Sequence, residues 1–154
     1  MKPIERITSF TVDHDRLLPG LYVSRIDGDV TTYDLRTRRP NSGDLMDNAT
    51  MHSLEHMFAT YIRNGALASQ VVYFGPMGCQ TGFYLLVRDA DNAAVLDEVK
   101  HTLSRILAHE GTVFGSTRKE CGNYMNLDLA LAKAEARRYL DELDARPVTF
   151  VYEG

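Results

Sequence analysis

Short apolar segments with strand character fill the first half of the chain, and longer segments with helical spacing fill much of the second. Runs rich in β-branched, aromatic and leucine residues predict strands at 7–12, 21–26, 30–36, 70–74, 83–87 and 148–152. Asp27-Gly28-Asp29 is typical of a hairpin turn and joins two of these runs. Proline and glycine predict loops at 38–43 and 75–82.

Three segments space their apolar residues three and four positions apart, as amphipathic helices do. The first begins near Thr50, a good N-cap residue, and ends near Asn64-Gly65, a common pair at helix C-termini. The others cover 91–109 and 127–143. Strands first, then helices interleaved with an antiparallel sheet, predict an α+β fold. We expect a single domain over 1–154, with a mainly antiparallel sheet packed by helices.

Length and charge limit the classes of function. The 154 residues are 44% hydrophobic, enough for one core, and the formal net charge of −4 gives no basic surface for nucleic acid. The N-terminal residues lack the apolar core of a signal peptide, and no apolar run could span a bilayer. With two cysteines and no export signal, we expect a cytoplasmic protein with reduced thiols and no membrane partner.

The predicted helix that begins near Thr50 carries an H-x-x-E-H pattern. A step of four residues turns a helix by about 400°, so His56 returns to within about 40° of His52, and Glu55 lies beside them. Two neutral imidazoles bind a transition metal, and an adjacent carboxylate can move a proton next to it. The pattern predicts metal-assisted chemistry on a helix packed against the sheet, without specifying the reaction.

A catalytic metal of this kind usually takes a third protein ligand. Among the other histidines, His101 and His109 fall outside the apolar side of their helix, and we expect them to be solvated. Cys121 lies in a turn-like segment before the last helix, where a thiolate could face a cation; a small buried residue is the alternative. Cys79 lies in a glycine-rich loop and is either a reactive thiol or a buried structural residue. A disulfide between the two cysteines is the remaining interpretation, which a reducing cytoplasm disfavours.

Several separated motifs together resemble the S-ribosylhomocysteine lyase (LuxS) family, which makes the precursor of the autoinducer-2 signal. The ordered set spans His14 to Lys133. It comprises V-D-H at 12–14, Y-D-L-R at 33–36, R-P-N at 39–41, the H-x-x-E-H helix through I-R-N at 62–64, P-M-G-C-Q-T-G-F-Y at 76–84, and E-C-G at 120–122 with Leu129, Ala132 and Lys133. A single H-x-x-E-H pattern is weakly specific, whereas the ordered set is strong.

The resemblance implies roles for named residues. The implied metal ligands are His52, His56 and Cys121. The implied general acid/base pair is Glu55 and Cys79. The implied contacts to the sugar part of the substrate are Ser9, His14 and Arg36. The resemblance further implies one Fe(II) per subunit, replaceable by zinc or cobalt, and a homodimer whose active sites lie at the subunit interface.

The implied reaction cleaves S-ribosylhomocysteine, a ribose joined to homocysteine through a thioether, to homocysteine and 4,5-dihydroxy-2,3-pentanedione. The sugar carbonyl migrates along the chain until it activates β-elimination of the thiol. Each migration moves a proton between neighbouring carbons, so a metal that holds the substrate oxygens and two bases at different places suit the chemistry.

Three positions depart from the family pattern. Tyr73 stands where many members have an Asp associated with the homocysteine amine, Gly75 replaces a usual Ser, and Leu127 replaces a His. None removes a metal ligand or an acid/base residue, so we expect altered substrate contacts or kinetics before loss of function.

Two other classes of function fit the H-x-x-E-H pattern alone. In an inverted-zincin metallopeptidase, Glu55 would activate water, and the third ligand would typically be a downstream carboxylate in place of Cys121. In a non-catalytic metal module the site would only hold the fold together, but such sites usually have four protein ligands.

Overall fold

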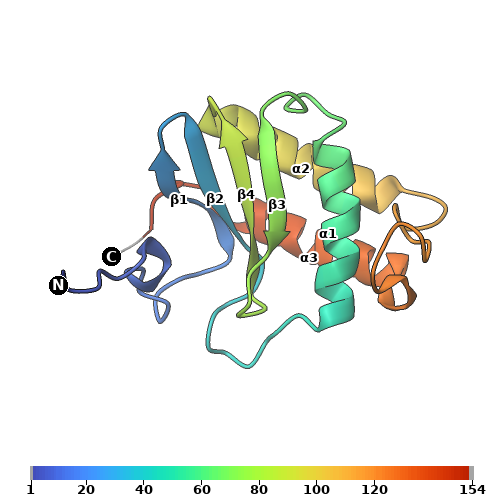
Figure 1. Ribbon diagram of the computed structural model, residues 1–154, viewed down its shortest axis with the longest axis horizontal. Coiled ribbons are helices and arrows are strands. Elements are labelled where there is room, and N and C mark those ends of the chain that lie inside the picture. The colour runs from blue at the N-terminus through green and yellow to red at the C-terminus, as the bar shows by residue number, and fades with distance from the viewer. Residues whose placement is uncertain (1, 153–154) are drawn as a thin grey trace.

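The computed structural model describes residues 2–152 and contains one antiparallel sheet with helices packed on it (Figure 1). The strands, in the spatial order β1-β2-β4-β3, are β1 (Gly20–Asp27), β2 (Val30–Arg36), β3 (Val71–Pro76) and β4 (Gly82–Arg88). The long helices are α1 (Asn48–Ile62), α2 (Asn92–Ala108) and α3 (Leu129–Ala145). Two short 3₁₀ helices cover Thr8–Phe10 and Tyr124–Asn126. The α+β prediction is confirmed.

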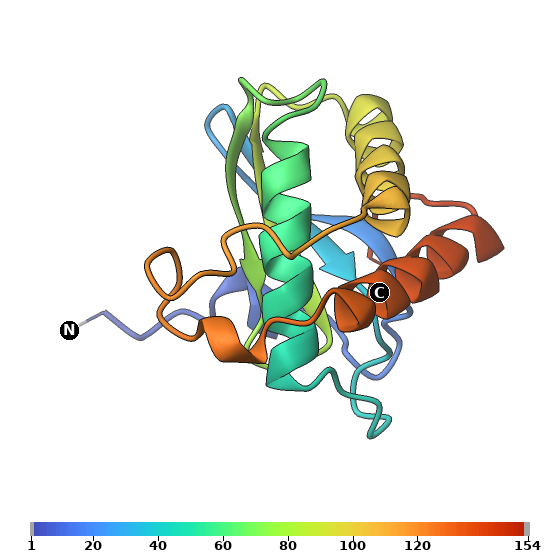
Figure 2. The same cartoon turned by 90° about the vertical axis from the view of Figure 1, so that its right-hand side faces the viewer.

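The three long helices lie on one side of the sheet, and the N-terminal segment extends away on the other side (Figure 2). In β4, Phe83, Leu85 and Val87 are buried, whereas Tyr84 and Leu86 are only half-buried, as expected for a sheet covered mainly on one face. The buried strand residues join residues of all three helices in one hydrophobic cluster. No helix within residues 2–152 is long and apolar enough to cross a bilayer.

Helix α1 packs against β3 and the other two helices. Its buried positions include Leu54, Met57, Phe58 and Ile62, which share one side at a spacing of three and four. The helix begins earlier than the sequence indicated, because the Asp47 carboxylate accepts a hydrogen bond from the Thr50 amide at 2.8 Å and so caps it. Thr50 is therefore inside the first turn, and the prediction that it caps the helix was wrong.

The two terminal strands predicted at 7–12 and 148–152 are not formed. Residues Thr8–Phe10 form a 3₁₀ helix, and no strand of the described chain pairs with them. Near the other end, only Phe150 makes a bridge, to Tyr22 of β1, and its positive φ of 64° interrupts an extended path. Alternating apolar residues favoured strands there, but a strand also needs a partner with free hydrogen-bonding groups.

Candidate metal centre

The histidines of α1 converge with Cys121, which precedes α3. The Cys121 sulfur lies 3.3 Å from His52 Nε2 and 3.8 Å from His56 Nε2. A tetrahedral metal with bonds of about 2.0 Å to nitrogen and about 2.3 Å to sulfur would hold such atoms roughly 3.5 Å apart. All three ligand atoms lie within 4.8 Å of one another. Two imidazoles and one thiol at this spacing fit a transition metal with one position left open.

The second ring nitrogen of each histidine faces an oxygen acceptor. His52 Nδ1 lies 2.5 Å from Asn126 Oδ1, and His56 Nδ1 lies 2.8 Å from the Phe114 carbonyl. Asn126 is itself oriented, because its Nδ2 donates to Asn48 Oδ1 at 2.6 Å. A proton on each Nδ1 leaves the Nε2 lone pair free and aimed at the cluster, as a metal ligand requires.

Backbone contacts hold Cys121 in place. Its amide donates to the Thr117 carbonyl at 3.1 Å, and the Asn123 amide lies 3.5 Å from its sulfur. Further along, the Asp128 amide donates to the Ser53 hydroxyl of α1 at 2.8 Å. The segment that carries the cysteine is thus tied to the helix that carries the histidines.

Glu55 is half-buried on α1 and lines a surface pocket of about 320 Å³ with His56, Phe74 and Phe114. Glu55 directly precedes His56 in the sequence and lies beside it in this pocket. A carboxylate is thus present beside one of the candidate metal ligands, and a carboxylate is a group that can exchange protons.

Cys79 forms a second group of reactive side chains on the loop between β3 and β4. Its sulfur lies 3.1 Å from Thr81 Oγ1 and 3.7 Å from Arg36 Nη1. Both cysteines are free thiols, so the interpretation of a disulfide between Cys79 and Cys121 was wrong. Cys79 is exposed, which also excludes a buried structural role for it.

Arg36 is buried beside Cys79, with only 3% of its side chain exposed. It donates to Asp34 Oδ2 at 2.7 Å and to Thr81 Oγ1 at 2.8 Å. Burial by itself would lower the pKa of Arg36, but the charge and hydrogen bond of Asp34 outweigh it and raise that pKa. The guanidinium therefore stays charged and is held in a fixed position.

His14 and Ser9 lie on the same side of the molecule as Cys79. His14 and Cys79 line one pocket of about 220 Å³, and His14 Nδ1 is 2.9 Å from the Val12 carbonyl. Burial raises the pKa of Tyr84, and a hydrogen bond from Ser9 lowers it, so Ser9 lies close to Tyr84. Tyr84 is on the sheet face away from the helices. The charges of Arg36 and Cys79 also act on Tyr84, so Tyr84 links Ser9 to this part of the sheet.

The eight residues singled out in the sequence thus form two groups within one chain. The metal group contains His52, Glu55, His56 and Cys121, and the cysteine group contains Ser9, His14, Arg36 and Cys79. The pocket beside Glu55 and the pocket beside Cys79 have no lining residue in common. Within one chain, the metal group and the cysteine group therefore line two separate surface pockets.

The sequence pattern of the S-ribosylhomocysteinase (LuxS) family matches residues 7–148. The chain belongs to this family. A protein named S-ribosylhomocysteine lyase from Finegoldia magna is 42% identical over 146 residues, which cover 92% of this chain and 93% of that protein. A protein of the same name from Clostridium beijerinckii is 43% identical over 146 residues, covering 91% and 92%. Another from Borreliella burgdorferi is 42% identical over 147 residues, covering 92% and 94%.

Membership of the LuxS family argues against both alternatives from the sequence. The only cluster of potential metal ligands found among residues 2–152 includes Cys121 and no carboxylate, unlike the expectation for an inverted zincin. It has three members, one fewer than a closed structural zinc site usually has.

Several supporting residues had no sequence signal. Asn126 contacts His52 from a remote segment, and Phe114 contacts His56 through its backbone carbonyl, so no local pattern reports either of them. Thr81 lies within the motif at 76–84, but its contact with Arg36 joins segments remote in the chain. Asp34 had a weak signal, since it precedes Arg36 by two on the same strand and thus shares its face. His101 is exposed, as expected. His109 is half-buried, and its Nδ1 lies 2.7 Å from the Tyr61 hydroxyl, so the prediction that His109 is solvated was wrong.

Proposed function

We propose that this protein is an S-ribosylhomocysteine lyase that forms homocysteine and 4,5-dihydroxy-2,3-pentanedione, the precursor of autoinducer-2. The observation that carries the proposal is the convergence of His52, His56 and Cys121 in a chain of the LuxS family. The catalytic unit is a single domain over 1–154, of which the family pattern covers 7–148.

We assign the metal to Fe(II), one per subunit, with zinc or cobalt able to replace it. The mixed nitrogen and sulfur donor set suits each of these ions. When bound, the metal supplies Lewis-acid stabilisation of negative charge on the substrate oxygens.

In this proposal Glu55 and Cys79 carry the protons. Each carbonyl migration removes a proton from a carbon beside the carbonyl and returns it to the neighbouring carbon, without oxidation or addition of water. In the last step a proton leaves carbon, the carbon–sulfur bond breaks, and the homocysteine sulfur receives a proton. Glu55 serves the carbons near the metal and Cys79 serves those on the opposite side.

Arg36, His14 and Ser9 complete the substrate site. Arg36 contacts Asp34, Thr81 and Cys79, and so holds the thiol in place. Its positive charge also interacts with substrate oxygens in this proposal. His14 accepts or donates through Nε2, because its Nδ1 is occupied by the Val12 carbonyl. Ser9 supplies a hydroxyl near Tyr84.

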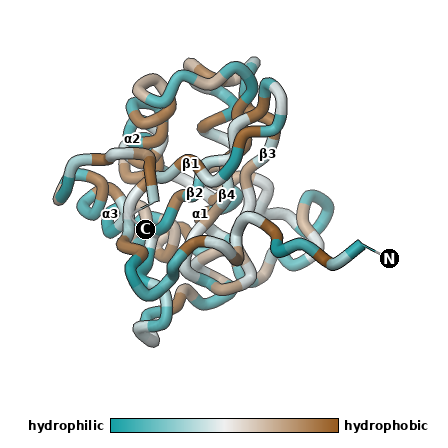
Figure 3. The backbone as a smooth tube through the Cα atoms, turned by 90° about the vertical axis from the view of Figure 1, so that its left-hand side faces the viewer, coloured by the Kyte–Doolittle hydropathy of each residue, from teal (hydrophilic) through white to brown (hydrophobic). Residues whose placement is uncertain are grey.

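We further propose a homodimer in which the metal group of one subunit meets the cysteine group of the other. The N-terminal segment extends away from the rest of the chain and includes hydrophobic positions (Figure 3). Its large apolar side chains are in solvent, with Ile4 100%, Ile7 56% and Phe10 64% exposed. Met125, near the metal group, is 81% exposed. Apolar side chains at this level of exposure beside both half-sites support a subunit contact there.

The dimer and its substrate belong in the cytoplasm in this proposal. Two free thiols, one of them exposed, suit a reducing compartment. S-Ribosylhomocysteine is then a small-molecule partner, and neither nucleic acid nor a membrane is required.

The decisive experiment measures thiol release from S-ribosylhomocysteine by protein loaded with Fe(II) or Co(II) without oxygen. Wild type should release one homocysteine per substrate, and Glu55→Gln and Cys79→Ala should each lose most of this activity while keeping the metal. Mixing the two inactive variants should restore part of the activity, because a mixed dimer contains one site with both wild-type groups. A metal-loaded, folded wild type that releases no thiol would overturn the proposal.

A further inference from the structure

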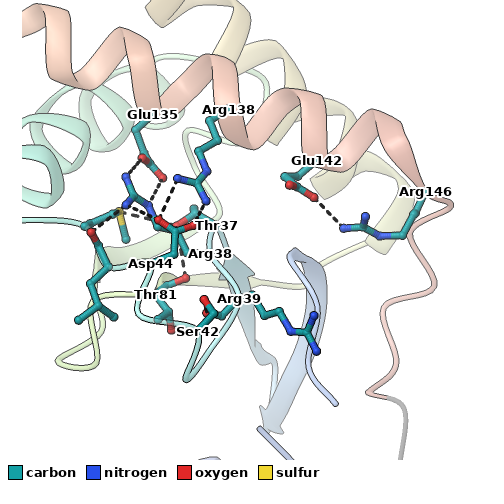
Figure 4. Close-up of polar contacts among 12 residues, drawn as sticks. Thr37, Arg38, Arg39, Ser42, Asp44, Thr81, Glu135, Arg138, Glu142 and Arg146 are labelled. Atoms are coloured by element: carbon teal, nitrogen blue, oxygen red, sulfur yellow. Dashed lines mark hydrogen bonds and ion pairs between the residues drawn. The ribbon is translucent and has the colours of Figure 1, made fainter. Parts of the chain in front are cut away.

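The loop between β2 and α1 is attached to α3 by two ion pairs (Figure 4). Arg38, two residues beyond β2, contacts Glu135 of α3 at two points. Its Nη2 lies 2.5 Å from Oε1, and its Nε lies 3.3 Å from Oε2. The Glu135 side chain is only 2% exposed, so this pair is largely removed from water.

The second ion pair joins Asp44 of the loop to Arg138, which follows Glu135 by three residues on α3. The hydrogen bond from Arg138 lowers the pKa of Asp44, which keeps the carboxylate charged. Arg38 links the two pairs, because its Nη1 donates to Asp44 Oδ1 at 3.0 Å and to the Leu45 carbonyl at 2.8 Å. We call these four side chains, Arg38, Asp44, Glu135 and Arg138, the α3 clamp.

The loop held by the α3 clamp forms one wall of the pocket that contains Cys79. Pro40, Asn41, Gly43 and Leu45 line that pocket together with His14 and Cys79. The wall therefore depends on the same segment, 38–45, that the clamp attaches to α3.

The loop also makes hydrogen bonds to the residues that follow Cys79. The amides of Thr37 and Arg38 both donate to the Thr81 carbonyl at 3.0 Å. The Met46 amide donates to the Gln80 carbonyl at 3.0 Å, and Gln80 Nε2 donates back to the Met46 carbonyl at 2.7 Å. A shift of the loop would thus be transmitted to the backbone beside Cys79.

The same helix is anchored at its start to the metal group. The Asp128 carboxylate caps α3, while the Asp128 amide donates to Ser53 of α1 at 2.8 Å. Cys121 precedes this anchor by seven residues. Helix α3 therefore connects the segment of the metal ligand to the wall of the Cys79 pocket.

We propose that the α3 clamp positions the Cys79 pocket for substrate binding, so that its four side chains are positioning residues of this enzyme. A buried ion pair adds little net stability compared with apolar residues of the same size, but a two-point arginine–carboxylate contact fixes geometry. The proposal rests on the function proposed above, because it treats the Cys79 pocket as part of the substrate site.

The test compares Glu135→Gln and Arg138→Gln with Arg137→Gln in the metal-loaded enzyme. Arg137 is the matched control, since it lies on α3 beside Arg138 but pairs with Asp141 at the exposed surface. The clamp variants should raise KM for S-ribosylhomocysteine by about tenfold, as expected when binding geometry is lost, and should also lower kcat, because Cys79 shifts with the loop. Arg38→Lys should behave like Glu135→Gln, because lysine lacks the two-point contact. A KM within about twofold of wild type in both clamp variants, or a parallel loss of bound metal, would overturn the proposal.

Hydrogen exchange provides a measurement that does not depend on activity. In Glu135→Gln, amides of 37–46 and 79–81 should exchange at least about tenfold faster, while those of 121–128 keep their wild-type rates. If wild type releases no thiol, the proposed function fails, and this exchange pattern still decides whether the clamp holds the Cys79 loop. Unchanged exchange at 79–81 in an active enzyme would overturn the clamp and leave the proposed function standing.

Discussion

Two residues outside the ligand set orient the histidines of the candidate metal centre. Asn126 and the Phe114 carbonyl each face an Nδ1, which directs Nε2 toward Cys121. Partners of this kind set the tautomer and ring orientation of a metal-ligating histidine. Asn126 acts through its side chain and Phe114 through its backbone carbonyl, so only the Asn126 contact can be removed by a substitution.

We predict that Asn126→Ala lowers the affinity for Co(II) or Zn(II) by about 10- to 100-fold, because His52 loses its orienting acceptor. Competition with a chromogenic chelator measures this affinity. Asn123→Ala is the control, since it keeps the backbone amide that lies 3.5 Å from the Cys121 sulfur. Equal affinities in the two variants would show that Asn126 does not orient the ligand.

The buried pair of Arg36 and Asp34 gives a second prediction at this scale. Arg36→Met should lower the free energy of unfolding by about 3–5 kcal/mol, because it leaves the Asp34 carboxylate, 2% exposed, without its cation. Urea unfolding measures this loss. The double variant Arg36→Met with Asp34→Asn should recover part of it, since the unpaired charge is removed. No recovery would mean that packing, and not charge, dominates at this site.

Among the elements, α1 has the most direct connection to chemistry, because it carries His52, Glu55 and His56 on the side away from its buried residues. Its helical period was readable from the sequence, and so was the placement of those three side chains together. The first residue of the helix could not be predicted, because Asp47 and Thr50 are both good capping residues and only the observed hydrogen bond decides between them.

Asp47→Ala should lower the free energy of unfolding by about 1 kcal/mol, the usual loss when a helix N-cap is removed. The matched control is Asp47→Asn, which keeps an oxygen acceptor for the Thr50 amide at 2.8 Å. Urea unfolding of the metal-free proteins compares the two. If the Asn variant is as destabilised as the Ala variant, charge and not capping accounts for the effect.

Across the whole molecule, the hydrophobic cluster joins the sheet to all three long helices without involving the metal ligands. Removing the metal by chelation should therefore leave the far-UV circular dichroism of a folded protein. Metal at 100 times its dissociation constant should add about 2.7 kcal/mol to the free energy of unfolding, by mass action alone. Unfolding on chelation would instead support the structural metal module.

Buried tyrosines make the stability of the whole fold sensitive to alkaline pH. Burial, helped by the charge of Asp91, raises the pKa of Tyr33 to about 12, and burial raises the pKa of Tyr139 well above its usual range. Their hydroxyls donate to Asn92 and to the Gly20 carbonyl. Below about pH 10 both tyrosine hydroxyls keep their protons in the folded and in the unfolded state. Above about pH 10 the unfolded state loses these protons, whereas the folded state keeps them.

The free energy of unfolding should therefore fall as the pH rises from 10 toward 12, by up to about 1.4 kcal/mol per pH unit for each tyrosine. Urea unfolding at a series of pH values measures the slope, which should be smaller in Tyr33→Phe. Tyr73→Phe is the control, because Tyr73 is 52% exposed. An identical slope in wild type and Tyr33→Phe would contradict the prediction.

The sequence by itself determined the features that depend on local period and local chemistry. These are the hairpin at Asp27-Gly28-Asp29, the three helices, the α+β class, and the pairing of His52 with His56 on one side of a helix. Each follows from hydrogen bonds and side-chain directions within a few residues of chain.

Only the tertiary structure decided what depends on partners far along the chain. It placed Cys121 against α1, buried Arg36 against Asp34, and left 7–12 and 148–152 without a strand partner. It also separated the candidate site into a metal group and a cysteine group. Such contacts form when chain closure brings remote segments together, and their free energy depends on burial that no local pattern contains.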